Sequence, residues 1–165
     1  MERYFSDDQL NIPIMMLDDD PIVLFEAEIT FKKLSFSNVS LVPDTNSAIQ
    51  CIKGQYSKVI SSDKRAKIDD SLVIKPKPIK VFFVDILLPG DVSGLDLIRA
   101  IRTEESFRSI RDLIIVAFSA NLDSVLIKKL WDLQVKYFVS KPADISRFVD
   151  LFFSIFAELD GRRGL

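Results

Sequence analysis

The sequence contains no histidine and a single cysteine, and both features limit its chemistry. Without histidine the chain has no Ser-His-Asp or Cys-His catalytic arrangement, no histidine general base and no histidine ligand for zinc. With Cys51 as its one thiol, it has no intrachain disulfide framework and no cysteine-based metal site. A metal or a covalent reaction would therefore depend mainly on oxygen ligands.

Long apolar runs are also missing. The longest are far shorter than the roughly 20 residues that span a bilayer. Residues 1–12 carry four charged side chains rather than the apolar centre of a signal peptide. The net charge of −2 gives no reason to expect direct binding to nucleic acid or to an anionic membrane. These features predict a cytoplasmic protein.

The pattern of apolar residues predicts an α/β fold. The length of 165 residues and a hydrophobic content of 48% suit one domain with a substantial core. Five short apolar runs predict strands, and at least three of them do not alternate with polar residues, as in strands that are covered on both faces. These runs span residues 13–17, 38–42, 80–84, 113–118 and 136–140.

A helical pattern follows each predicted strand. The five patterns span residues 22–34, 45–53, 94–105, 122–133 and 143–159. Asp20 and Pro21 suit the N-cap and first position of the first helix, on which Ile22, Phe25 and Ile29 share one face. Right-handed crossovers turn this order into a three-layer, doubly wound sheet of five parallel strands, for which the strand order 2-1-3-4-5 is one possible arrangement.

One segment, residues 54–79, interrupts this alternation. It replaces a connection that normally takes about 2–6 residues, and lysine and arginine outnumber aspartate within it. Its last part contains Lys-Pro-Lys-Pro and cannot be helical. We interpret it as a solvated surface insertion, with a partner-docking element as the alternative.

Polar side chains follow four of the five predicted strands. Asp18, Asp19 and Asp20 follow the first, Asp85 the third, Ser119 the fourth and Lys141 the fifth. In an open α/β sheet, ligands bind outside the carboxyl ends of the strands, near the point where strand order reverses. With the order 2-1-3-4-5, the acids of the first and third strands would converge there, with the serine and lysine beside them.

This group of side chains has a definite chemistry. Carboxylates at close range favour a bound cation, and oxygen ligands without histidine or cysteine favour Mg²⁺. Lys141 could neutralise a phosphoryl group and Ser119 could donate a hydrogen bond to it. A carboxylate that faces both Mg²⁺ and a lysine can attack phosphorus to form an acyl phosphate, and Asp85 is the candidate nucleophile.

Four segments together resemble the receiver domains of two-component response regulators. They are MMLDDDP (15–21), VFFVDILLPG (81–90), IIVAFSA (114–120) and YFVSKP (137–142), in the order typical of that family. The resemblance covers residues 12–158 and implies the strand order 2-1-3-4-5. It implies a bacterial signalling protein rather than a conventional enzyme. The chemistry of such a receiver is limited to its own phosphorylation and dephosphorylation.

The resemblance also implies a role for each site residue. Asp85 would accept phosphate from a histidine kinase or a histidine phosphotransfer protein. Asp19 and Asp85 would bind Mg²⁺ directly, Asp18 would act through a coordinated water, and the backbone carbonyl of Leu87 would complete the protein ligands. Ser119 and Lys141 would contact the phosphoryl oxygens, and Lys141-Pro142 would be a cis peptide. Ser119 and Phe138 would form the conformational switch.

Three positions depart from the family pattern. Ser93 stands where glycine is common, with Gly94 one residue later, so the loop after Asp85 has one extra residue. Gln134 replaces a usual glycine before the fifth strand, and Phe138 occupies a position that is often tyrosine. None of these departures touches the acidic, serine or lysine positions, so we expect a competent receiver.

Two alternatives remain open on the sequence. A haloacid-dehalogenase-type phosphohydrolase would use Asp18 as nucleophile, with Asp20, Ser119 and Lys141, but it leaves Asp85 without a role. The second alternative is a scaffold protein of the same fold that is not phosphorylated. For Asp20, a helix N-cap is the favoured interpretation over a metal ligand.

The resemblance divides the chain into three parts: an N-terminal extension (1–11), a receiver domain with the insertion (12–159), and a C-terminal tail (160–165). The tail would be either the end of the protein or a linker to an output module. Apolar residues beside the inward stripes of the last two helices, Trp131 and Phe153, could support a homodimer or a downstream protein partner, whose identity the sequence leaves open.

Overall fold

A computed structural model describes residues 3–52 and 78–164 of the chain. Its centre is a five-stranded parallel sheet in the order β2-β1-β3-β4-β5, which confirms the predicted fold class and strand order. The strands are β1 (Ile14–Leu17), β2 (Val39–Val42), β3 (Val81–Asp85), β4 (Ile114–Ser119) and β5 (Tyr137–Ser140). The predicted insertion lies, up to residue 77, outside the described residues.

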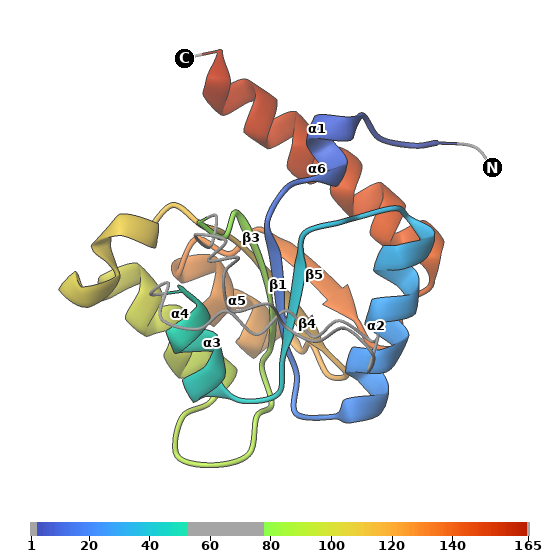
Figure 1. Cartoon of the computed structure of the whole chain (residues 1–165). Helices are drawn as coiled ribbons and strands as arrows, with labels where there is room; N and C mark the ends of the chain where they lie inside the picture. The colour runs from blue at the N-terminus through green and yellow to red at the C-terminus, as the bar shows by residue number, and fades with distance from the viewer. Residues whose placement is uncertain (1–2, 53–77, 165) are drawn as a thin grey trace, which may run out of the picture.

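Helices cover both faces of the sheet (Figure 1). The helices are α1 (Asp7–Leu10), α2 (Pro21–Lys33), α3 (Thr45–Ile52), α4 (Gly94–Thr103), α5 (Ser124–Asp132) and α6 (Ile145–Arg163), with a 3-10 helix η1 at Glu105–Ile110. One apolar core joins α2 and α6 to the sheet, and a second joins α3, α4 and α5 to the opposite face. Among the described residues, no helix is both long and apolar enough to cross a membrane.

Strand burial explains why the predicted strands lacked polar alternation. Every residue of β1, β3 and β4 is buried, because helices pack on both sides of these strands. In β1, Ile14 and Met16 belong to the core under α2 and α6, whereas Met15 and Leu17 belong to the core under α3, α4 and α5. The three central strands therefore form a rigid support for whatever side chains follow them.

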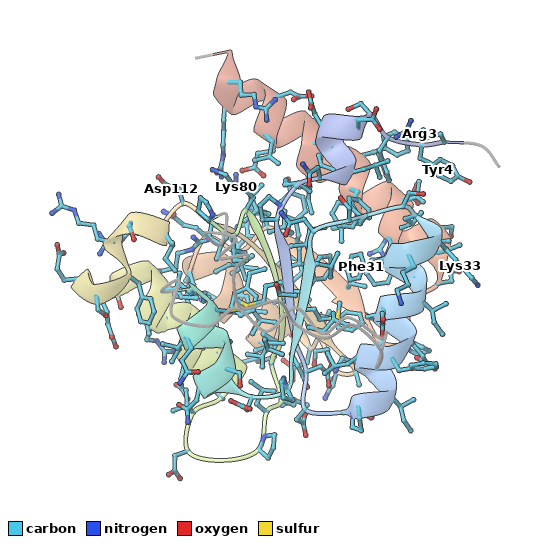
Figure 2. All side chains as sticks on the ribbon, in the orientation of Figure 1. Arg3, Tyr4, Phe31, Lys33, Lys80 and Asp112 are labelled. Atoms are coloured by element: carbon cyan, nitrogen blue, oxygen red, sulfur yellow. The ribbon has the colours of Figure 1, made fainter. Side chains whose placement is uncertain are left out.

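Helix α2 leaves part of its apolar surface exposed. Asp20 caps it and Pro21 begins it, as predicted. Ile22, Phe25 and Ile29 do share one face, but that face is exposed to solvent, with Ile22 66% and Phe25 62% exposed. The buried contacts come from Ala27 and Phe31, and Figure 2 shows Phe31 directed from α2 toward the sheet.

The N-terminal segment packs against the end of α6 (Figure 1). Phe5 is 4% exposed, and its ring centroid lies 5.3 Å from that of Phe156 and 5.7 Å from that of Phe36. Ser6 caps the short helix α1 through a capping box with Gln9. Helix α6 continues to Arg163, four residues beyond its predicted end at residue 159. The division of the chain into extension, domain and tail stays a prediction.

Candidate functional site

The polar residues predicted at the strand ends lie at one edge of the sheet. Asp18 directly follows β1, Asp85 is the last residue of β3, Ser119 is the last residue of β4, and Lys141 directly follows β5. Because all five strands are parallel, their carboxyl ends share this edge. Asp18, Asp85 and Ser119 are the buried polar or charged residues among those described.

Three carboxylates form the acidic part of the site. One oxygen from each of Asp18, Asp19 and Asp85 lies within 4.8 Å of the other two. Asp18 is fully buried and Asp85 is 4% exposed, whereas Asp19 is exposed. Carboxylates this close repel one another when ionised, and burial strengthens the repulsion. The arrangement therefore favours a positive charge between them.

Lys141 supplies one such charge. Its ammonium Nζ lies 3.3 Å from Oδ2 of Asp85 and donates a close hydrogen bond to Oδ2 of Asp18. The Lys141 side chain is only 15% exposed, and Nζ lies 5.1 Å from the centroid of the Phe118 ring. The Lys141-Pro142 peptide is cis, as predicted. Lys141 thus bridges the two buried carboxylates.

The environment of Asp85 changes its protonation equilibrium. Burial raises the pKa of the Asp85 carboxyl above its usual value, and the neighbouring charge of Asp18 raises it further. The charge of Lys141 and a 3.1 Å hydrogen bond from the Leu87 backbone N–H to Oδ1 act in the opposite direction. A second cation beside Asp85 would lower this pKa and favour the nucleophilic carboxylate form.

The donor set fits Mg²⁺. Two ligands of an octahedral Mg²⁺ at about 2.1 Å lie roughly 3–4 Å apart, so the acidic oxygens need to approach one another only slightly. All candidate ligands are oxygen atoms, and the exposure of Asp19 leaves room for the waters that Mg²⁺ retains. The part of the Leu87 carbonyl in such a site stays a prediction.

Ser119 ends the strand next to β3, and its hydroxyl contacts the backbone of Asn121. Its hydroxyl makes long contacts of 3.4 Å with the backbone N–H and carbonyl of Asn121. Its backbone carbonyl accepts a hydrogen bond from the Lys141 N–H at 2.9 Å, which ties the ends of β4 and β5 together. The hydroxyl contacts are weak enough for rotation toward a ligand. Its role in binding a phosphoryl group stays a prediction.

Phe138 is half-buried on β5 and packs against helix α5. Its ring stacks with that of Trp131 at a centroid distance of 6.4 Å and an interplanar angle of 30°. Trp131 is 60% exposed, so the pair connects the second apolar core to the surface. The predicted switch role of Phe138 stays a prediction.

Asp20 lies outside the acidic cluster. Its Oδ1 accepts a hydrogen bond from the Ile22 N–H at 2.9 Å, which confirms the predicted N-cap of α2. Its own N–H donates to Oδ1 of Asp18 at 2.9 Å, so it helps to orient that buried carboxylate. This backbone contact was not foreseen from the sequence, although the Asp-x-Asp spacing is typical of such turns.

Gly94 explains why the loop after Asp85 has its glycine one residue later than the family pattern. A Cβ at Gly94 would lie 2.0 Å from the backbone oxygen of Asp85, so no larger residue fits there. The Gly94 N–H donates to the carbonyl of Ile86 at 3.3 Å. Ser93 instead caps α4 through a capping box with Asp96. The close approach that needs a glycine is therefore made one residue later in the chain, by Gly94.

No protein-family model and no curated protein matches the sequence. Solved structures do match. A two-component response regulator from Legionella pneumophila is 19% identical, with a TM-score of 0.67, over 89% of this chain and 99% of that one. This chain has the fold of a response regulator receiver domain.

Two further receiver structures support the same comparison. The isolated REC domain of RcsB from Salmonella enterica serovar Typhimurium, studied with the phosphomimetic BeF3-, is 23% identical, with a TM-score of 0.62, over 92% of this chain and 90% of that one. RcsB in complex with DNA is 20% identical, with a TM-score of 0.65, over 90% of this chain and 61% of that longer one. At these identities the likeness establishes the receiver fold.

Proposed function

We propose that the chain is a phospho-accepting receiver of a two-component phosphorelay and that Asp85 is the acceptor. The observation that carries the proposal is the contact of Lys141 with both Asp85 and Asp18 inside a cluster of three carboxylates. A lysine that served only to neutralise a buried acid would need one carboxylate partner, whereas Lys141 contacts two. A site with one lysine, a buried aspartate and further acids suits the transfer of a phosphoryl group to a carboxylate.

The proposed reaction is a displacement at phosphorus. An ionised Asp85 oxygen attacks the phosphorus of a phosphohistidine, a P–O bond forms and the P–N bond breaks. The electrons of the P–N bond go to the ring nitrogen, and the imidazole leaves in its neutral form with a proton on its other nitrogen. Lys141 neutralises negative charge on the transferred group, and Ser119 donates a hydrogen bond to one of its oxygens after rotation of its hydroxyl. Mg²⁺ held by Asp19 and Asp85, with Asp18 acting through water, would supply charge neutralisation at the phosphoryl oxygens.

The phosphodonor is proposed to be a histidine kinase or histidine phosphotransfer protein that packs on α2. Ile22 and Phe25 are exposed at the start of this helix, immediately after the acidic residues. A donor that brings phosphohistidine to Asp85 must pass over this end of the helix, and apolar contacts there would bury exposed aromatic and aliphatic surface. We also propose a bacterial and cytoplasmic setting, which the resemblance to receiver domains supports. The downstream partner stays open.

The phosphohydrolase alternative is weakened by Asp20. That alternative needs Asp20 as a second catalytic acid two residues after Asp18, but the Asp20 carboxylate caps α2. It also gives no reason for Asp85 to lie buried against Lys141. The scaffold alternative, in which no phosphoryl group is accepted, is addressed by experiment.

The test is phosphorylation by acetyl phosphate with Mg²⁺, measured by intact mass. We expect one phosphoryl addition in the wild-type protein and none in Asp85→Asn or in the presence of excess chelator. Asp91→Asn, which changes an exposed acid in the following loop, is the matched control and should be phosphorylated like the wild type.

The alternatives give different results. The hydrolase predicts phosphate release that Asp18→Asn abolishes and that Asp85→Asn only weakens. The scaffold predicts no addition in the wild-type protein with acetyl phosphate or with a phosphorylated histidine phosphotransfer protein. Retained labelling of Asp85→Asn at a single site would disprove the assignment of the acceptor.

A further inference from the structure

A polar cavity lies at the edge of the sheet opposite Asp85, where β4 and β5 begin. Its volume is about 370 Å³, and its lining includes Leu113, Ile114 and Tyr137. Asp112, labelled in Figure 2, marks this edge of the molecule, remote from the Pro89–Gly94 loop. Pockets for small molecules typically measure roughly 300–1,000 Å³, so the cavity suits a small ligand.

The cavity is lined by more cations than anions. The cations are Arg102, Arg111, Lys136 and Arg162, and the anions are Asp112 and Glu158. They come from the end of α4, the segments that precede β4 and β5, and the last turns of α6. Segments far apart in the sequence thus bring an excess of positive charge to one half-open cavity.

Glu158 neutralises only one side of the cavity. Its Oε1 accepts from Arg162 at 2.7 Å and from Lys136 at 3.3 Å, and its Oε2 accepts from the Tyr137 hydroxyl at 2.5 Å. With these three donors, both carboxylate oxygens are engaged. Arg102 and Arg111 make no hydrogen bond to Glu158, although the charges of Asp112 and Glu158 act on Arg102 through space.

Arg102 has no ion-pair partner among the described residues. Its Nε donates to the carbonyl of Leu133 at 3.0 Å, and one terminal nitrogen donates closely to the carbonyl of Arg111. Burial lowers the pKa of the Arg102 guanidinium below its usual value. These bonds fix the position of the guanidinium and leave its other terminal nitrogen available to a ligand.

Arg111 contains an unsatisfied donor. Its Nε is the one buried side-chain nitrogen or oxygen without a hydrogen-bond partner in the described part of the chain. Its NH2 donates to the carbonyl of Glu104 at 3.2 Å, and its nearest carboxylate, on the exposed Glu105, is 3.9 Å away. Buried donors are normally satisfied, so this nitrogen favours an added acceptor. Because it is shielded from solvent, an acceptor would reach it after a shift of the Arg111 side chain.

We propose that this cavity binds a small anionic molecule through a phosphate or carboxylate group held by Arg102 and Arg111. Guanidinium groups present paired N–H donors that match both of these anions. The fixed position of Arg102, and the place of Arg111 in the cavity lining with a buried Nε that has no hydrogen-bond partner, supply the donors. The proposal does not depend on phosphorylation of Asp85, which lies at the opposite edge of the sheet.

The experiment is an NMR titration of the full ¹⁵N-labelled chain with inorganic pyrophosphate and, separately, with citrate. Both are added in the presence of chelator, so that the acidic site holds no Mg²⁺, and against sodium chloride of equal ionic strength. We expect saturable shifts of backbone amides in residues 112–115 and at Lys136 and Tyr137. Binding of both anions indicates the shared chemistry, and binding of one identifies the group.

Variants separate specific binding from general charge attraction. Arg111→Gln should weaken binding by about tenfold or more, and Arg102→Gln should do the same if the protein remains folded. Arg108→Gln is the control, because it removes the same charge from an exposed side chain that lies outside the cavity. We expect it to change the affinity less than about twofold.

Three results would overturn the proposal. The first is the absence of saturable shifts with either anion. The second is a set of shifts confined to the edge that carries Asp85 and Lys141. The third is an equal loss of affinity in Arg108→Gln and Arg111→Gln. None of these would affect the proposed phosphorylation of Asp85, which is measured by mass.

Discussion

Replacement of Gly94 by alanine tests the packing of the loop that supports Asp85. An added Cβ would lie 2.0 Å from the Asp85 backbone oxygen, 2.8 Å from the Ile86 Cα and 2.9 Å from the Asp85 carbonyl carbon. All three are backbone atoms, so no side-chain rotation can relieve the overlap. The loop or the end of β3 would have to move.

Two opposing effects decide the magnitude. Gly94 is the first residue of α4, where alanine is favoured over glycine by at most about 1 kcal/mol. Overpacking of a rigid site costs about 1–3 kcal/mol, and a contact this short belongs at the upper end of that range. We therefore expect Gly94→Ala to lower the free energy of unfolding by about 2 kcal/mol.

Urea unfolding measures this difference. With an m-value of about 1–3 kcal/mol/M, the midpoint for Gly94→Ala should fall by roughly 1 M. Gly161→Ala is the matched control, because a Cβ at this position in α6 meets no atom within 4 Å. It should raise the free energy of unfolding by about 0.5–1 kcal/mol. If both variants are stabilised, the reasoning about the loop is wrong.

Three further predictions concern other parts of the molecule. Phe5→Ala should lower the free energy of unfolding by about 3 kcal/mol in urea titration because it empties an aromatic cluster, whereas Tyr4→Ala, at a half-exposed position, should change it by less than about 0.5 kcal/mol. Leu87 is 63% exposed beside Asp85 and offers no hydrogen bond to a water, so Leu87→Asn should speed the loss of the phosphorylated mass at equal Mg²⁺; an unchanged rate would refute this. Burial alone would raise the pKa of the Glu158 carboxyl, but its hydrogen bonds outweigh burial and lower the pKa. The ionised carboxylate therefore stabilises the folded state above the usual glutamate pKa of about 4.3. This stabilisation is lost as the pH falls through the lower pKa of the folded state. Thermal unfolding from pH 7 to pH 3 should therefore show the difference between the wild type and Glu158→Gln shrinking at the acid end, and a constant difference would contradict the assignment.

The sequence alone determined the fold class and the place of the candidate site. Continuous apolar runs that alternate with amphipathic helices allow few arrangements, because parallel strands must be covered on both faces and crossovers are right-handed. With the strand order 2-1-3-4-5, which the family resemblance implies, residues that end neighbouring strands must meet at one edge. Asp18, Asp85, Ser119 and Lys141 could therefore be placed together from their positions relative to the strands.

Only the tertiary structure decided which apolar faces are buried. Periodicity shows that Ile22 and Phe25 share a face of α2, but it does not show which face meets the sheet, and the contacts of Phe31 and Ala27 determined that. The burial of Phe5 against α6 likewise depends on contacts between the two ends of the chain, which no local pattern encodes.

The close approach of Gly94 to Asp85 and the cavity that contains Arg102 and Arg111 have the same origin. Each depends on where separate segments come to lie in space. Local sequence fixes the secondary structure and the order of the segments, whereas the distances between side chains from different segments are set by packing of the whole core.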